Sequence, residues 1–202
     1  MLLGRCRGES YFARMLLGAV GANHISPVPV VVRDRGTMSS KLDLGCGPFK
    51  KLDGSISVDI NPAPHVDVVH DLNCYPYPFS DEQFEHIELS HILEHIHHPA
   101  LAMAEVYRLA RPGATIRVIT PHYTSQLSYG DLTHYHHFGY ITFSHLCNGG
   151  KFTLISHRVH FTDFYKVIGV ALLANWFPRR WEKYVSFLFP ALYVEVTLRV
   201  VK

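Results

Sequence analysis

Hydrophobic residues along this chain fall into short runs separated by glycine, proline, asparagine and aspartate. Runs of this length are typical of strands in a buried β-sheet. They predict strands at 41–45, 55–60, 66–72, 86–92, 114–121, 151–161 and 192–201. Between the fourth and fifth of these, residues 99–113 carry apolar positions at helical spacing, from Pro99 to the Pro112-Gly113 stop. This alternation predicts an α/β fold with a mostly parallel sheet, in which ligands bind at the carboxyl ends of the strands.

The first connection between strands is unusually short. Only the seven residues PFKKLDG separate Gly47 from the second predicted strand. A parallel crossover ordinarily needs a dozen or more residues. We therefore expect the first crossover helix to be shortened or missing.

The first 37 residues show no steady hydrophobic period, and the pattern changes abruptly at Met38. One interpretation is that 1–37 is an N-terminal extension of partial order. The other is that Met38 is the natural start. In both cases residues 38–202 are expected to form one domain, because 202 residues are too few for two domains of ordinary size.

Composition narrows the class of protein. A hydrophobic share of 48% and a charged share of 18% are typical of a globular chain. The net charge of +2 provides no strong basic field, so no nucleic-acid partner is expected. The four cysteines lack C-x-x-C spacing, which favours a reducing compartment. The patch MLLGAVGA near the N-terminus is too short and too glycine-broken for a typical secretory signal, so we expect a cytoplasmic protein.

The chemistry-bearing motif is LDLGCGP at 42–48, directly after the first predicted strand. Gly45 and Gly47 allow a tight turn and the close approach of a ligand. A dinucleotide site would require a third glycine at position 50, where this chain has lysine, so a nicotinamide-dependent oxidoreductase is disfavoured. Asp43 adds negative character, which suits a cationic ligand better than a phosphate.

Two more acidic residues stand at predicted strand ends. Asp59 ends the second strand and can accept two hydrogen bonds from a ribose diol. Asp71 ends the third strand, where it could receive an adenine amino group. A glycine turn and two such acids, without a phosphate cradle, indicate an adenosine ligand that lacks phosphates.

In order and spacing, these motifs resemble the class I S-adenosylmethionine-dependent methyltransferases of the type 11 sort. The resemblance rests on LDLGCGP (42–48), VDI (58–60), HDLNCYPYPFSDEQFEHIELSHILEHI (70–96) and RLARPGATIRVITP (108–121). It covers about residues 40–143 well and the remainder more loosely. It implies a Rossmann-like, mostly parallel sheet with an antiparallel C-terminal strand, and S-adenosyl-L-methionine as the cofactor. Typical members of this family have the first crossover helix, so its expected loss in this chain affects how the methionine end of the cofactor would be covered.

The resemblance also implies which residues bind the cofactor, and no metal is among the implied ligands. The expected contacts are Asp43, Gly45 and Gly47 at the methionine end, Asp59 and Ile60 at the ribose, Asp71 and Leu72 at the adenine, and Ser90 and His91 nearby.

Residues His91 to His95 also spell H-x-x-E-H, the signature of one class of zinc peptidases. That motif requires both histidines on one face of a helix. Here a predicted strand runs into His91, and Pro99 begins a new helix. A histidine-rich zinc hydrolase is therefore kept only as a minor alternative.

A loop rich in histidine and tyrosine, residues 121–143, follows the fifth predicted strand. A hydroxyl acceptor needs a base to remove its proton, and an imidazole suits that task at neutral pH. His122, Asp131 and His134 are our candidate catalytic residues, and members resembling this chain carry a similar pattern. Two alternatives remain: these residues only shape the loop, or they hold a metal.

The segment 162–191 is longer than a hairpin link requires and mixes aromatic with basic residues. We expect one or two helices packed on the sheet. A peripheral contact with a membrane or lipid is a sharper interpretation, and a dimer contact is another.

We therefore predict a methyltransferase that acts on an unidentified acceptor. The absence of an N/D-P-P-aromatic motif after the fourth strand favours a small-molecule, sugar or lipid hydroxyl. A non-catalytic S-adenosylmethionine-binding protein is the main alternative.

Overall fold

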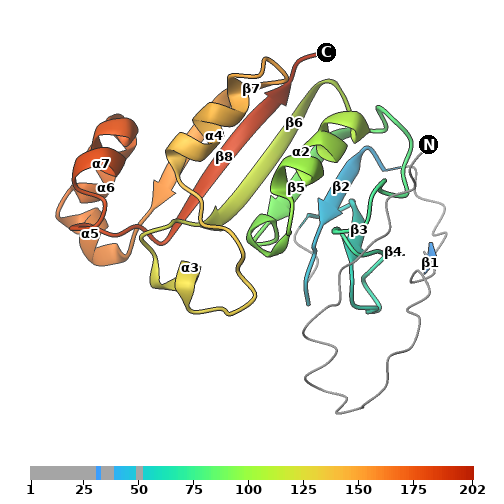
Figure 1. Cartoon of the computed structure of the whole chain (residues 1–202), viewed down its shortest axis with the longest axis horizontal. Coiled ribbons are helices and arrows are strands. Elements are labelled where there is room, and N and C mark those ends of the chain that lie inside the picture. Colours follow the sequence, from blue (N-terminus) through green and yellow to red (C-terminus); the bar gives the residue numbers. More distant parts are fainter. Residues whose placement is uncertain (1–30, 33–38, 49–51) are drawn as a thin grey trace, which may run out of the picture.

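The computed structural model describes residues 31–32, 39–48 and 52–202 (Figure 1). Its strands are β1 (Val31–Val32), β2 (Lys41–Leu44), β3 (Ile56–Asp59), β4 (Val68–Val69), β5 (Phe84–Ser90), β6 (Ala110–Pro121), β7 (Phe152–His160) and β8 (Tyr193–Val200). Its helices are η1 (Leu93–His95), α2 (Pro99–Leu109), α3 (Gln126–Tyr129), α4 (Tyr140–Cys147), α5 (Asp163–Val167), α6 (Val170–Trp176) and α7 (Pro178–Tyr184).

One mixed sheet with the strand order β1-β4-β3-β2-β5-β6-β8-β7 organises the described residues. The strands β4, β3, β2, β5 and β6 run parallel to one another, whereas β8 is antiparallel to both β6 and β7, and β1 is antiparallel to β4. This confirms the predicted Rossmann-like α/β fold with an antiparallel C-terminal strand. The described residues between β2 and β3 form turns and no helix, in agreement with the expected loss of the first crossover helix.

Several predicted boundaries differ from the observed ones. Strand β4 has only two residues where 66–72 was expected, because Asp71 and the residues after it turn away from the sheet. Helix α2 ends at Leu109 rather than at 113, and the chain enters β6 at Ala110. Val31–Val32, which lie within the predicted N-terminal extension, pair with β4 as an antiparallel edge strand. The rest of 1–37 and the boundary at Met38 lie outside the described residues.

The hydrophobic core occupies one face of the sheet. Helices α2 and α4 cross in front of this face in Figure 1, and β8 directs Val194, Val196 and Leu198 toward it. Helix α2 contributes an apolar stripe that includes Met103 and Val106, and Pro99 at its start supplies a preset helical φ. Helices therefore cover this face, and the carboxyl ends of the strands are left to form a site.

The opposite face carries a row of polar side chains. Asp43, Glu88, Arg117 and Thr197 are successive register partners across β2, β5, β6 and β8. Arg117 forms ion pairs with Glu88 and Glu195. Ion pairing of this kind lets the sheet bury charged groups at lower cost.

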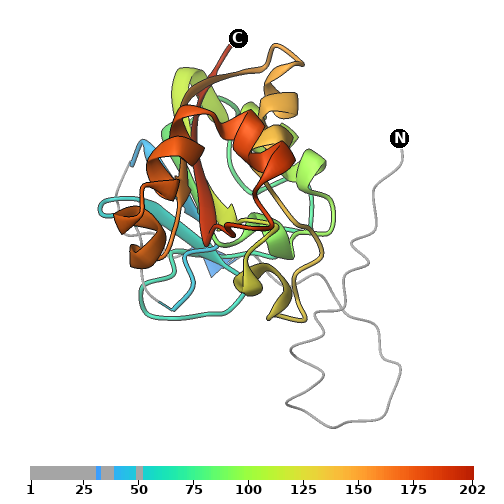
Figure 2. The ribbon, with the colours of Figure 1, turned by 90° about the vertical axis from the view of Figure 1, so that its left-hand side faces the viewer.

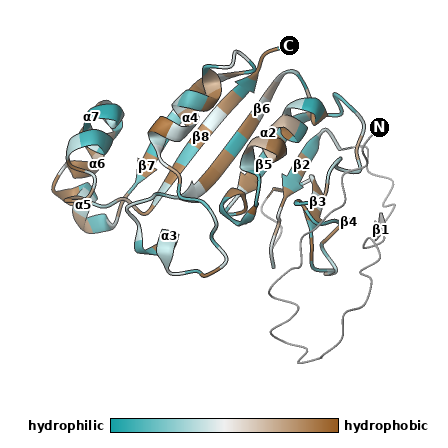
Figure 3. Ribbon diagram, viewed as in Figure 1, coloured by the Kyte–Doolittle hydropathy of each residue, from teal (hydrophilic) through white to brown (hydrophobic). Residues whose placement is uncertain are grey.

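The segment 162–191 differs from its prediction in the number of helices. It forms three short helices, α5 to α7, beside the carboxyl end of the edge strand β7, where Asn175 of α6 bonds to the backbone of Val159 (Figures 1 and 2). Trp181 and Ala174 pack with Phe161 in a second small core. Figure 3 shows the hydrophobic α6 beside the more hydrophilic α7. Within the described ranges, no helix has the length and apolar character needed to cross a membrane.

Candidate active site

The turn after β2 has a backbone that a ligand can approach closely. Gly45 and Gly47 have φ of +70° and +62°, a backbone conformation that residues with a side chain rarely adopt. The backbone N–H groups of Gly45 and Cys46 donate to the carbonyl of Val58 at 2.8 and 3.1 Å, which joins the turn to β3. A Cβ on Gly45 would lie 2.3 Å from Ile92, whereas a Cβ on Gly47 would meet nothing within 4 Å in the part of the chain that the structure describes. With respect to these residues, Gly47 presents bare backbone to an open space.

Asp59 connects the glycine turn to the end of β3. Its Oδ2 accepts a hydrogen bond from the Gly47 N–H, and its Oδ1 accepts one from the Asn61 N–H, both at 2.9 Å. A carboxylate has about four acceptor sites, so capacity remains for two ribose hydroxyls. Ile60, the next residue, is 40% exposed and offers an apolar surface beside it.

The other predicted cofactor residues lie at neighbouring strand ends. Asp71 Oδ1 accepts from the N–H of Asn73, and Leu72 is buried beside it. Ser90, which ends β5, is also buried, and His91 follows with a positive φ of 53°. Asp43 has no exposed surface and lies on the polar face of the sheet. It can support the turn only from within β2.

His65 is a site residue that was not predicted from the sequence. Its Nε2 lies 2.8 Å from the carbonyl oxygen of Gly47, so this ring braces the turn from the β3–β4 connection. A histidine in a loop rich in proline carries no local signal of such a contact.

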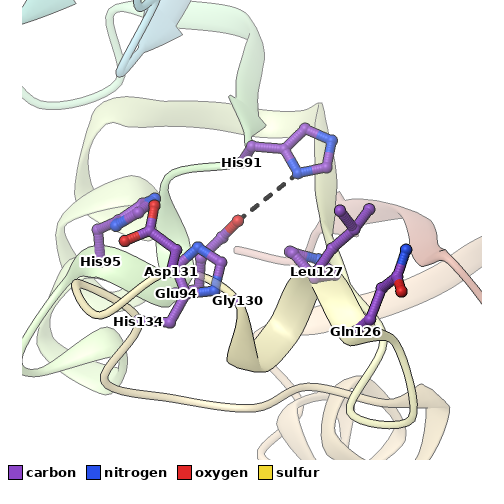
Figure 4. A pocket seen from close by; sticks show the side chains of 9 residues that line it. His91, Glu94, His95, Gln126, Leu127, Gly130, Asp131 and His134 are labelled. Carbon is purple, nitrogen blue, oxygen red and sulfur yellow. Dashed lines mark ion pairs between the residues drawn. The ribbon is translucent and has the colours of Figure 1, made fainter.

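A cavity of about 650 Å³ opens next to the end of β5. Its lining comes from His91, Glu94, His95, Pro121, Gln126, Leu127, Gly130, Asp131 and His134 (Figure 4). These residues belong to the end of β5, to η1, to the end of β6, and to α3 with the loop after it. Two of the three predicted catalytic residues, Asp131 and His134, therefore meet in one pocket.

Glu94, His95 and His134 form a compact group on one side of this pocket (Figure 4). One ligand atom from each lies within 4.8 Å of the others. The two imidazole rings are 4.6 Å apart between centroids. Glu94 and His95 were noticed in the H-x-x-E-H stretch. His91 and His95 do not share a helix face, because η1 has only three residues and His91 precedes it. No spacing along the sequence joins Glu94 and His95 to His134.

Hydrogen bonds fix the orientation of both rings. His134 Nδ1 is 3.1 Å from the carbonyl oxygen of Ser128, and His95 Nδ1 is 2.9 Å from Thr133 Oγ1. Thr133 Oγ1 donates to Asp131 Oδ1 at 2.7 Å, so it accepts from the His95 ring. These bonds with Thr133 lower the pKa of Asp131. In the neutral rings, the lone pair therefore resides on Nε2 of each histidine.

His122, the third predicted catalytic residue, is not brought into the pocket lining. Its side chain has no exposed surface, and its Nδ1 is 2.8 Å from Thr124 Oγ1. Its Nε2 lies 3.5 Å from Glu182 Oε1, and its ring is 5.1 Å from that of Trp181. His157 belongs to the same buried region, where burial lowers its pKa to about 4. His122 thus connects the end of β6 to α7.

The arrangement fits an adenosine-type cofactor. The open backbone at Gly47, the spare acceptor capacity of Asp59 and the exposed Ile60 lie at adjacent strand ends. The described part of the turn opens no helix toward a phosphate. The mixed sheet and this site are those expected of class I enzymes that use S-adenosylmethionine.

Comparison with known proteins identifies a domain within the chain. Residues 42–118 match the family model described as "Methyltransferase domain". Residues 42–118 therefore form a methyltransferase domain, which contains the glycine turn and Asp59. No curated protein matches it significantly in sequence.

Solved structures share the fold. A SAM-dependent methyltransferase from Archaeoglobus fulgidus gives a TM-score of 0.57 at 20% identity, covering 79% of this chain and 85% of that one. A methyltransferase of the same type from Mesorhizobium loti gives 0.51 at 14% identity, with coverages of 81% and 92%. The 1,6-didemethyltoxoflavin-N1-methyltransferase of Burkholderia thailandensis, solved with S-adenosylhomocysteine, gives 0.51 at 13%, with coverages of 80% and 71%. At these identities the likeness establishes the fold alone.

Proposed function

We propose that this methyltransferase transfers its methyl group to the hydroxyl of an acceptor held in the 650 Å³ pocket. The observation that carries the proposal is the pair of oriented imidazoles, His95 and His134, whose Nε2 lone pairs can accept a proton. A neutral amine attacks without prior loss of a proton, whereas a hydroxyl depends on such a group. Holding the sulfonium and the acceptor in line would supply much of the rate enhancement.

The proposed cofactor contacts follow the geometry of the turn. Gly45 and Gly47 would face the methionine end, with Asp43 supporting them from within β2. Asp59 with Ile60 would hold the ribose, Asp71 with Leu72 the adenine, and Ser90 with His91 the side toward the pocket. Of the candidate catalytic residues, His134 would act on the acceptor. Asp131 would orient His95 through Thr133, and His122 would stabilise α7.

The test measures S-adenosylhomocysteine release with sugar, phenol and lipid alcohols. Each alcohol is paired with its fully O-methylated derivative, which has no hydroxyl to modify. With an active alcohol, His134→Gln should lower kcat by about 10²–10³-fold while the KM for S-adenosylmethionine stays nearly constant.

The matched control is His136→Gln, because His136 bonds to the carbonyl of His97 and does not line the pocket. This variant should retain full activity. Equal rates in His134→Gln and the wild type, or activity with amines alone, would contradict the proposal.

We also propose that α5–α7 hold the enzyme against an anionic lipid surface, and that the acceptor is a lipid alcohol. Ten large apolar side chains in this segment are each more than half exposed: Phe164, Val167, Ile168, Leu172, Leu173, Trp176, Phe177, Tyr184, Phe187 and Leu188. So much exposed apolar surface on one segment marks an interaction site. Four basic and two acidic residues give 162–191 a net charge of +2. That charge favours anionic lipid over a second copy, which would oppose like charges.

A further inference from the structure

We infer that Glu94, His95 and His134 form a binding site for a divalent transition-metal ion, with Zn²⁺ as the best match. Two imidazoles and one carboxylate are a recurrent catalytic zinc set, in which the fourth position is left to water or substrate. The three ligand atoms lie within 4.8 Å of one another. Around tetrahedral zinc they would be roughly 3.4 Å apart, given Zn–N distances of about 2.0–2.1 Å. Binding of the ion would require side-chain movements that shorten these distances by up to roughly 1.4 Å.

The carboxylate of Glu94 provides an independent reason. Its side chain is 2% exposed, and among the described residues neither of its oxygens has a hydrogen-bond partner. Its contact with His91 Nδ1 at 3.6 Å is longer than a hydrogen bond (Figure 4). A buried carboxylate without such bonds is costly unless it is paired or coordinates a metal. A shared proton would satisfy Glu94 and one histidine, whereas a metal ion would satisfy all three groups.

The surroundings supply the supporting bonds that metal sites use. Metal-ligating histidines usually donate their second N–H to a carbonyl or carboxylate, which fixes the tautomer. His134 does so through Ser128, and His95 through Thr133 to Asp131. Both rings therefore present Nε2 as the ligand atom.

The position in the pocket gives the ion a role. The coordination positions left by the protein would face the 650 Å³ cavity, where an acceptor hydroxyl could bind. The ion would make a hydroxyl beside it a stronger acid, so that the proton would pass to solvent in the pocket and the oxygen would become the better nucleophile. This consequence rests on the proposed function and gives His134 the role of ligand. The binding of the ion does not depend on it.

The experiment uses the full chain after treatment with a chelator and dialysis. Zn²⁺ is added, unbound metal is removed by gel filtration, and bound zinc is counted by mass spectrometry. Competition with a chromophoric chelator gives the affinity, and Mg²⁺ serves as the comparison ion. We expect one zinc per wild-type chain, no retention of Mg²⁺, and at least a 100-fold loss of affinity in Glu94→Gln and His134→Ala. Asp131→Asn, which changes only a supporting bond, should lose about 10–100-fold.

Two neighbouring histidines outside the cluster provide matched controls. His136→Ala and His137→Ala should bind zinc like the wild type. No stoichiometric zinc in the wild type, or equal losses in these controls, would overturn the inference. The melting shift caused by S-adenosylhomocysteine is measured on the same samples. A retained shift shows that the variants are folded and separates failure of the metal site from failure of the methyltransferase assignment.

Discussion

The two glycines of the β2 turn have different constraints. Both need a left-handed backbone, which costs an alanine about 1–2 kcal/mol. At Gly45 a Cβ would also collide with Ile92, whereas Gly47 faces open space. Forcing an added methyl group into a packed site typically costs a further 1–3 kcal/mol or so.

Gly45→Ala should therefore lower the free energy of unfolding by about 2–5 kcal/mol, and Gly47→Ala by about 1–2 kcal/mol. Urea unfolding of the ligand-free variants measures both. Equal losses at the two positions would show that Ile92 does not confine Gly45. Gly47→Ala should instead weaken cofactor binding, because its methyl group would occupy the open space.

At the residue scale, the sequence predicted what is local and missed what the fold assembles. The turn glycines and Asp59 were readable because spacing along the chain defines a strand end. Asp131 and His134 were predicted as candidate catalytic residues, and the loop that carries them lines the pocket. Glu94 and His95 were considered only as part of the H-x-x-E-H motif, which was disfavoured. Their cluster with His134 could not be predicted, because it forms only when the chain reverses direction through α3. Nothing local distinguished the buried His122 from the pocket residue His134.

At the element scale, the strands were more predictable than the helices of 162–191. The positions of the strands follow from short apolar runs bounded by glycine, proline, asparagine and aspartate. Segment 162–191 has no single helical period: Gly169 and Pro178 divide it into three helices. The sequence showed that this segment is rich in apolar residues. Which of them are exposed depends on the tertiary structure, in which Trp181 and Ala174 are the ones that pack in the second small core.

These helices make the membrane proposal testable by flotation with vesicles of phosphatidylcholine and phosphatidylglycerol. The double variant Trp176→Ser/Phe187→Ser removes side chains that are 70% and 79% exposed. It should reduce vesicle binding at least 10-fold, since burial of each such side chain contributes about 1.5–3 kcal/mol. Leu101→Ser on α2, 52% exposed, is the control and should bind normally. The proposal would be contradicted if the wild type did not bind anionic vesicles and light scattering showed that it forms a dimer instead.

At the scale of the whole molecule, the fold has fewer crossover helices than a typical Rossmann-like fold. The sheet retains its order without a helix in the described part of the first crossover, and α2 and α4 cover its core face. The cofactor turn and the pocket lie along the same edge because parallel strands end together. The sequence could predict this edge from motif order alone, whereas the shape of the pocket depends on long-range packing of the loop 122–139.

The most direct test of the account is a thermal melt with and without S-adenosylhomocysteine. At about 100 times its dissociation constant, a ligand that binds the native state adds roughly 2.7 kcal/mol. For a chain of this length the midpoint should rise by about 5–10 °C. Asp59→Ala should abolish the rise, and Asp53→Ala, an exposed acid in the preceding turn, should keep it. Asp59→Asn, which can still bond to the turn, controls for loss of structure. A wild type without a shift, or an unchanged shift in Asp59→Ala, would contradict the account of the cofactor site.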